Sequence, residues 1–285
     1  MSAAKRGRGR SRPDSRGPSR GPRGRSTRGS TPVRKEPAKR RGLGGDQVEG
    51  RQAVRELLVA GRRRVREVLL AGEMESAPIL EDIIDLADEA KVPIREIGRS
   101  KFEQEARTES SQGVIARAAP LDEFSLDELI DLDGPALLLV LDGITDPGNL
   151  GAILRTAECA GVTGVVLPRH RAAHITPTVT KAAAGAIEHL PMAVVAGLPA
   201  AMADLQKAGI WTVGLDASAG DSLFDLRVAD EPLAIVLGSE GAGLSRLVAQ
   251  RCDTVVSLPL RGVLGSLNVA SAAAVACFEI VRRRG

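Results

Sequence analysis

Apolar residues follow a regular pattern from residue 135 to the end of the chain. Short, almost continuous apolar runs alternate there with longer stretches of helical periodicity. Such runs are typical of parallel strands covered by helices on both faces. We therefore predict an α/β domain over residues 135–285, built on a parallel sheet. The expected strands are 136–143, 164–168, 190–196, 210–216, 232–238 and 254–260, and the expected helices start near Asn149, Thr178, Pro199, Leu244 and Leu267.

A smaller α/β pattern precedes this domain, over residues 46–118. It predicts helices over 48–59 and 78–90, and strands over 65–71, 92–97 and 113–118. Residues 119–134 hold six carboxylates and are expected to form an acidic linker or a short surface helix. One turn of the smaller module carries four arginines, for which an RNA contact and a solvated loop are equally consistent interpretations. These are Arg62, Arg63, Arg64 and Arg66.

The first 45 residues follow neither pattern, and they change the meaning of the overall charge of +3. They contain 15 basic and two acidic residues, a local charge of +13, whereas the remaining 240 residues carry −10. Their Arg, Gly, Ser and Pro cannot bury enough apolar surface to offset the entropy of ordering, so we predict a disordered tail. Such a tail attracts phosphates without sequence preference. A tail that serves only solubility is the alternative.

Composition excludes several functional classes. No run of about 18 apolar residues predicts a membrane span, and the first 45 residues lack the apolar stretch of a secretory signal. The three cysteines lie far apart, which suits a reducing cytoplasm. With one Trp, four Phe and no Tyr, the chain is poorly suited to stacking many RNA bases.

Three loops that follow predicted strands hold the candidate chemistry, since ligands of such sheets bind beyond the carboxyl ends of the strands. The first, 142–162, contains an Asp-Pro-Gly turn before a helix that carries Asn149 and Arg155. The second, 237–245, is LGSEGAGLS, whose glycines do not form the dinucleotide-binding pattern GxGxxG. The third, 255–284, opens an alanine-rich helix with Ser-Leu-Asn. Taken singly, each loop is explained equally well by helix caps and tight packing.

In combination, NxGxxxR at 149–155, GSEGxGL at 238–244 and SLNVA at 266–270 resemble the three motifs of the SpoU (TrmH-type) RNA 2′-O-ribose methyltransferases of the SPOUT superfamily. The resemblance covers residues 47–283, and 48–58 and 111–116 resemble the ribosomal-protein-like substrate-binding domain of the rRNA branch. It implies a C-terminal trefoil knot, a homodimer and S-adenosylmethionine as methyl donor. Ser111 stands where many relatives are expected to have His, which weakens the assignment of the substrate.

The resemblance also implies roles for individual residues. The cofactor pocket is expected to be lined by Leu237, Gly238, Leu258, Leu260, Leu267 and Asn268. Arg155 is expected to contact the 2′-hydroxyl, oriented by Asn149, while Ser266 and Asn268 align the ribose and Glu240 braces its loop. The very high intrinsic pKa of arginine makes the neutral form scarce. We therefore favour an Arg155 that binds the adjacent phosphate and stabilises the developing alkoxide over one that acts as general base.

Methyl transfer to a hydroxyl needs no metal, and the sequence indicates none. His170 and His174 have a helical i,i+4 spacing, but no further residue of ligand type joins them, so a structural or surface role is favoured. The predicted function is S-adenosylmethionine-dependent 2′-O-methylation of RNA in the cytoplasm, on a guanosine of the peptidyl-site loop of 23S rRNA. The alternatives are another rRNA nucleotide (the thiostrepton-resistance type), a tRNA, or a non-catalytic RNA-binding factor of ribosome assembly.

Overall fold

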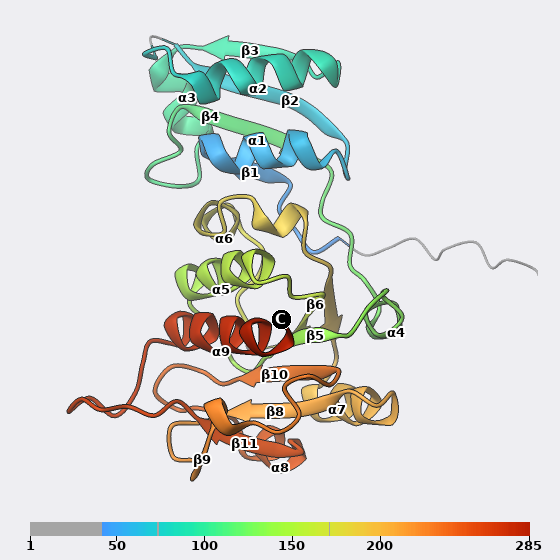
Figure 1. Ribbon diagram of the computed structural model, residues 1–285. Coiled ribbons are helices and arrows are strands. Elements are labelled where there is room, and N and C mark those ends of the chain that lie inside the picture. Colours follow the sequence, from blue (N-terminus) through green and yellow to red (C-terminus); the bar gives the residue numbers. More distant parts are fainter. Residues whose placement is uncertain (1–41, 73, 171) are drawn as a thin grey trace, which may run out of the picture. The chain divides into compact units, whose positions relative to one another are not determined.

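The computed structural model describes residues 42–72, 74–170 and 172–285 (Figure 1). The predicted tail therefore lies outside the described residues as far as residue 41. The described residues all belong to one compact unit. None of the helices among them is long and apolar enough to cross a membrane.

A four-stranded sheet in the order β1-β4-β2-β3 forms the smaller module. Its strands are β1 (Gln47–Glu49), β2 (Val65–Ala71), β3 (Ile94–Ile97) and β4 (Val114–Ala118). The helices are α1 (Arg51–Ala60), α2 (Pro78–Glu89) and α3 (Arg99–Glu105). Helices α1 and α2 share one apolar core with the sheet. On α3, Phe102 packs into a second, smaller core with Leu69 and Ile115.

The predicted helix over 48–59 is wrong at its start. Residues 47–49 form β1, which pairs antiparallel with β4, and α1 begins only at Arg51. Gly50 separates the two elements with a φ of 97°, in the left-handed region that favours glycine. A strand of three residues is too short to show an alternating pattern. Its pairing partner also lies more than 60 residues away in the sequence, so no local signal marks it as a strand.

A seven-stranded sheet in the order β7-β6-β5-β10-β8-β11-β9 forms the larger module, and all its strand pairs are parallel. This confirms the predicted α/β fold. The strands are β5 (Leu137–Leu141), β6 (Gly164–Pro168), β7 (Met192–Val195), β8 (Trp211–Leu215), β9 (Asp221–Ser222), β10 (Leu233–Leu237) and β11 (Thr254–Ser257). The six predicted strands are present, and the two-residue β9 was missed because Asp-Ser has no apolar pattern.

Two layers of helices cover this sheet, as predicted. One core joins the sheet to α5 (Pro147–Cys159), α6 (Pro177–Ala182), the short helix η1 (Ala186–Glu188) and α9 (Val269–Arg284). A second core joins it to α4 (Leu126–Ile130), α7 (Leu198–Lys207) and α8 (Arg246–Arg251). The short helix η2 (Leu223–Asp225) follows β9. Helix α9 packs beside α5 (Figure 1). The trefoil knot stays a prediction.

Strand register decides where the loops meet. The central strand β10 is completely buried and pairs residue for residue with β5 on one side and β8 on the other. The carboxyl ends of these three strands therefore lie side by side. We call this end of the seven-stranded sheet the carboxyl edge.

The arginine cluster of the smaller module has a structural member. The Arg63 guanidinium donates from Nε and Nη2 to both carboxylate oxygens of Glu188, at 2.9 and 2.6 Å. Its Nη1 donates to the backbone oxygens of Gly45 and Ala119, at 2.6 and 2.7 Å. The two side chains are 6% and 0% exposed. Arg63 is thus a buried contact between the two modules, and neither predicted interpretation of the cluster applies to it.

Candidate active site

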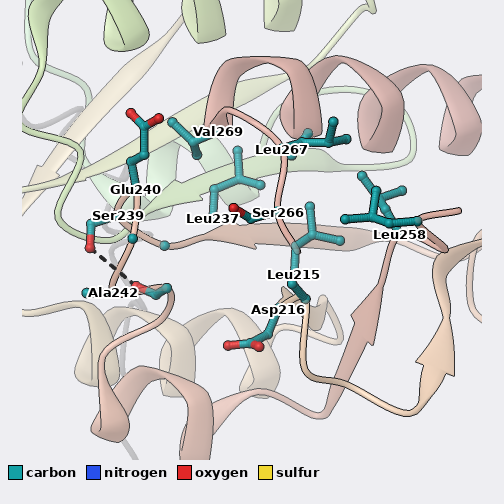
Figure 2. A pocket seen from close by; sticks show the side chains of 16 residues that line it. Leu215, Asp216, Leu237, Ser239, Glu240, Ala242, Leu258, Ser266, Leu267 and Val269 are labelled. Carbon is teal, nitrogen blue, oxygen red and sulfur yellow. Dashed lines mark hydrogen bonds between the residues drawn. The ribbon is translucent and has the colours of Figure 1, made fainter. Parts of the chain in front are cut away.

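A cavity of about 240 Å³ opens at the carboxyl edge, where the connections that follow β8, β10 and β11 meet (Figure 2). Its walls come from the ends of β8, β10 and β11 and from the start of α9. The lining residues are Leu215, Asp216, Ala217, Leu237, Gly238, Ser239, Glu240, Gly241, Ala242, Gly243, Leu258, Leu260, Ser266, Leu267, Val269 and Ala272. The second and third predicted loops therefore build one site.

A tight turn after β10 shapes one wall of the cavity. Ser239 and Gly243 exchange backbone hydrogen bonds of 3.0 and 2.9 Å, so the chain folds back on itself. A Cβ atom on Gly238 would lie 2.1 Å from the Gly243 carbonyl carbon, which no side chain can tolerate. Gly241 and Gly243 have φ values of 82° and 67°. The glycines of this loop are required by the turn itself.

A chain of hydrogen bonds ties the three motif loops together at the cavity rim. The Asn149 Nδ2 atom donates to Glu240 Oε2 at 3.0 Å. The Asn268 Nδ2 atom donates to Asn149 Oδ1 at 2.9 Å. Because each side chain comes from a different loop, the chain holds α5, the β10 turn and α9 in one arrangement. Glu240 accepts the Asn149 amide, and Asn149 has both ends of its amide engaged.

Helix caps fix where two of these side chains stand. Asp146 caps α5, since its Oδ1 accepts the backbone N–H of Asn149 at 2.6 Å. Asn268 caps α9, since its Oδ1 accepts the backbone N–H groups of Ala270 and Ser271 at 2.9 and 3.3 Å. The cap uses the oxygen of Asn268 and the link to Asn149 uses its nitrogen. A single side chain thus both starts α9 and joins it to α5.

The sequence analysis missed Asp216, the carboxylate that follows β8. Its Oδ1 accepts the hydroxyl and the backbone N–H of Ser218, at 2.6 and 2.8 Å. The Ser218 hydroxyl, and then its backbone N–H, lower the Asp216 pKa below its usual value. The cavity therefore has an ionised carboxylate in its lining beside that of Glu240. The rule that ligands bind beyond strand ends could have found it, because 210–216 was predicted as a strand that ends in Asp.

The structure brings most of the predicted site residues together. Of the predicted cofactor residues, Leu237, Gly238, Leu258, Leu260 and Leu267 line the cavity. Asn268 is absent from its lining and belongs to the hydrogen-bonded group of Asn149, Glu240 and Asn268 at the cavity rim, which we call the rim cluster. Of the predicted catalytic residues, Glu240 and Ser266 line the cavity. Asn149 and Asn268 reach it through Glu240.

Arg155 is the exception among the predicted catalytic residues. It is exposed on α5 and is not among the residues that line the cavity. Six residues of α-helix separate it from Asn149, which turns the two side chains about 120° apart and moves them about 9 Å along the axis. The amide of Asn149 is hydrogen-bonded to Glu240 and Asn268 instead. The catalytic role of Arg155 stays a prediction.

Among the described residues, no group of three or more His, Cys, Asp or Glu side chains could hold a metal ion. His170 and His174 are both exposed in the connection that follows β6.

Comparison with known proteins gives the family. Residues 136–278 match the SpoU rRNA Methylase family. Residues 47–124 match the substrate-binding domain of RNA 2′-O ribose methyltransferases. The chain belongs to the SpoU rRNA methylase family. It is an RNA 2′-O-ribose methyltransferase that uses S-adenosylmethionine, as the resemblance of its motifs implied.

Individual relatives span most of the chain. The 23S rRNA (guanosine-2′-O-)-methyltransferase RlmB of Photobacterium profundum is 40% identical over 210 residues, which cover 73% of this chain and 84% of that protein. A putative TrmH family tRNA/rRNA methyltransferase of Staphylococcus haemolyticus is 38% identical, over 83% of this chain and 95% of that protein. The SpoU methyltransferase AviRb of Streptomyces viridochromogenes in complex with AdoMet has a TM-score of 0.70 and 26% identity, over 84% of this chain and 90% of that one.

The cavity fits the cofactor chemically. S-adenosylmethionine carries a positively charged sulfonium and an adenine ring. The cavity offers aliphatic side chains from Leu237, Leu258 and Leu267, and the carboxylates of Asp216 and Glu240. Opposite charge and apolar surface therefore occur in the same enclosure. When bound, the cofactor supplies the methyl group.

Proposed function

We propose that this enzyme methylates the 2′-hydroxyl of a guanosine in the peptidyl-site loop of 23S rRNA. The rim cluster of Asn149, Glu240 and Asn268 carries the assignment of the reaction, since it joins all three motif loops at one cavity. The names of relatives at 40–43% identity support the choice of RNA and nucleotide.

In the proposed mechanism, the chain positions the ribose and stabilises charge on the attacking oxygen. Methyl transfer requires the hydroxyl to approach in line and to lose or share its proton. Ser266, exposed on the cavity wall, aligns the ribose together with Asn268. Arg155 binds the adjacent phosphate and stabilises the alkoxide as it forms. Glu240 keeps the β10 turn and α5 in register through Asn149.

Mapping of ribose methylation by mass spectrometry tests the target. Total rRNA and tRNA from a strain that lacks this gene are compared with RNA from the same strain complemented with the wild-type gene. We expect one guanosine of 23S rRNA to lose its 2′-O-methyl group and to regain it on complementation. Loss of a methyl group from another rRNA nucleotide, or only from tRNA, would overturn the assignment.

Calorimetry with S-adenosylmethionine tests the cavity as the cofactor site. The methyltransferase should bind about one S-adenosylmethionine per protein chain, in the cavity at the carboxyl edge. A protein that only binds RNA would give no heat of cofactor binding. We place the enzyme in the cytoplasm, in keeping with an rRNA substrate and three free cysteines.

We also propose a homodimer, as the family resemblance implies. Val275 and Phe278 lie one helical turn apart on α9 and are 40% and 49% exposed, so they form an apolar patch on its surface. Phe278→Glu should shift the mass measured by analytical ultracentrifugation from dimer to monomer. Leu247, 66% exposed on α8, belongs to the opposite helix layer, and Leu247→Glu serves as control. A wild-type monomer would refute the dimer.

A further inference from the structure

The cavity at the carboxyl edge has negative charge on its walls without positive charge to balance it. Of the described residues that line it, Asp216 and Glu240 are acidic, and none is Lys, Arg or His. Figure 2 shows the two carboxylates apart from each other, on different sides of Leu237. A ligand in this cavity therefore lies in the field of two carboxylates that no cation of the lining neutralises.

Asp216 has the more effective of these two charges. It is half-buried, whereas Glu240 is exposed, so water and salt screen the charge of Asp216 less. One oxygen of Glu240 also accepts the Asn149 amide. The Asp216 Oδ2 atom, in contrast, has no hydrogen bond or ion pair with the described residues. Its interaction is left for a ligand.

The position of the Asp216 carboxylate is fixed by its neighbours. Its Oδ1 atom accepts the Ser218 hydroxyl at 2.6 Å and the Ser218 backbone N–H at 2.8 Å. These two donors hold the pKa of Asp216 below its usual value, so the carboxylate is ionised at neutral pH. The Oδ2 atom lies beside the β10 turn, since a Cβ atom on Gly243 would be 3.2 Å from it. A charge that starts on β8 thus reaches the turn that shapes the cavity.

Methyl transfer changes the charge of the ligand that such a cavity holds. S-adenosylmethionine carries a sulfonium, an ammonium and a carboxylate, which amount to one net positive charge. In the transfer the ribose oxygen forms a bond to the methyl carbon, the hydroxyl proton passes to solvent, and the electron pair of the broken C–S bond stays on sulfur. The product, S-adenosylhomocysteine, is a thioether without net charge. Substrate and product therefore differ chiefly by one positive charge and one methyl group.

We propose that Asp216 is a specificity-determining residue, which makes the cavity favour the positively charged cofactor over its neutral product. The same carboxylate then helps to bind S-adenosylmethionine before transfer and holds S-adenosylhomocysteine less firmly afterwards, so it limits inhibition by the product. The proposal rests on the cavity as the cofactor site and is independent of which RNA is methylated.

Isothermal titration calorimetry with the full-length protein tests the role of Asp216. The Kd is measured for S-adenosylmethionine and for S-adenosylhomocysteine, in wild type and in Asp216→Asn. The quantity of interest is the ratio of the two Kd values, because the adenosine, ammonium and carboxylate groups occur in both ligands and cancel. We expect Asp216→Asn to weaken binding of S-adenosylmethionine by about three- to tenfold, the effect of one partly screened charge, and to leave S-adenosylhomocysteine almost unchanged.

A third ligand separates charge from the methyl group. Sinefungin carries an ammonium group where the cofactor has its methylated sulfonium. If charge is what Asp216 recognises, Asp216→Asn should weaken sinefungin binding as much as it weakens S-adenosylmethionine binding. An unchanged affinity for sinefungin would mean that the methyl group is recognised instead, and would overturn the proposal.

Control variants distinguish this role from a structural one. Asp85→Asn makes the same change of charge at an exposed position on α2 of the smaller module and should leave both Kd values as in wild type. Asp216→Glu keeps the charge and should restore most of the wild-type ratio. Equal losses for all three ligands in Asp216→Asn would show that Asp216 only shapes the loop, and an unchanged ratio would show that it contributes nothing. Either result would overturn the proposal.

Product inhibition provides a second readout. In an assay that follows transfer of a radiolabelled methyl group to rRNA, Asp216→Asn should be inhibited by lower concentrations of S-adenosylhomocysteine, relative to its KM for the cofactor, than the wild type. An unaltered ratio of inhibition constant to KM would contradict the proposed effect on product release. Thermal unfolding of each variant establishes that it is folded.

Failure of this proposal is distinguishable from failure of the cavity as the cofactor site. Ala272 lines the cavity from α9, and Ala272→Phe should fill part of it and abolish binding of all three ligands. If the folded Ala272→Phe variant binds them normally, the cofactor site has been misplaced. If it binds none of them but Asp216→Asn keeps the wild-type ratio, only the role of Asp216 is wrong.

Discussion

The connection between α1 and β2 and the carboxyl edge of the larger sheet both carry arginines, but these arginines have opposite surroundings. Arg63 in the first region uses four hydrogen bonds and is almost completely buried against Glu188. Arg155 on α5 and Arg169 after β6 are exposed, and their side chains form no hydrogen bond or ion pair with the described residues. A buried guanidinium that already donates four hydrogen bonds is not available to a phosphate. The charge of Arg63 is therefore neutralised by Glu188, whereas Arg155 and Arg169 keep their charge available.

The largest expected effect is on turnover at the carboxyl edge. Arg155→Ala should lower the rate of methyl transfer by about 100-fold or more, the usual cost of removing a group that stabilises transition-state charge. Calorimetry should find the affinity for S-adenosylmethionine nearly intact, since Arg155 does not line the cavity. Transfer of a radiolabelled methyl group to rRNA measures the rate. A wild-type rate in this variant would remove Arg155 from the mechanism.

Arg63→Ala should act on stability instead. The substitution leaves the Glu188 carboxylate buried without the one side-chain partner that it has among the described residues, which costs about 3–5 kcal/mol in free energy of unfolding. Urea denaturation followed by circular dichroism measures the change. Arg63→Met combined with Glu188→Leu should recover part of the loss, because no buried charge remains. A loss below about 1 kcal/mol in the single variant would contradict the buried contact.

Asn268 allows capping and catalysis to be separated within the carboxyl edge. Asn268→Ala removes the cap of α9 and should cost about 1 kcal/mol of stability. Asn268→Asp keeps a capping oxygen but loses the N–H that bonds Asn149. Both variants should lower kcat, but only the alanine variant should lower stability. If Asn268→Asp has the wild-type kcat, the link between α5 and α9 is irrelevant to catalysis.

The smallest effect is expected at Arg64, beside Arg63 in the sequence. Its side chain is exposed and forms no hydrogen bond or ion pair with the described residues, so Arg64→Ala should change the free energy of unfolding by no more than about 0.5 kcal/mol. The same denaturation experiment compares it with Arg63→Ala. Equal losses at the two positions would mean that burial does not distinguish them.

Much of the fold could be predicted because its signals are local. The strands β5, β6 and β10 consist of apolar residues that are buried on both faces, and their runs are visible within a few letters of sequence. The short strands β1 and β9 were not predicted, because their signals are not local. They are defined by pairing with distant segments and not by their own residues.

The candidate site was predicted only in part, because some of its contacts join segments that are distant in the sequence. The resemblance of the three motifs to the family pointed to Glu240, Ser266 and the aliphatic cofactor residues, which the structure gathers around one cavity. It did not locate Asp216, which follows a fourth strand outside the motifs. The resemblance also implied that Asn149 orients Arg155, which stays a prediction; in the structure the amide of Asn149 joins Glu240, 91 positions along the chain.

The sequence by itself determined the order along the chain of most strands and helices, the three motif loops and the contrast between a basic segment and an acidic body. Each of these depends on composition or on periodicity within a short window. The tertiary structure decided which charges remain available. Arg63 meets Glu188 across 125 positions, and Gly44 pairs with Ile175 in the connection that follows β6. Such pairings depend on how the strands are ordered and registered, because only the folded chain brings distant residues within hydrogen-bonding distance.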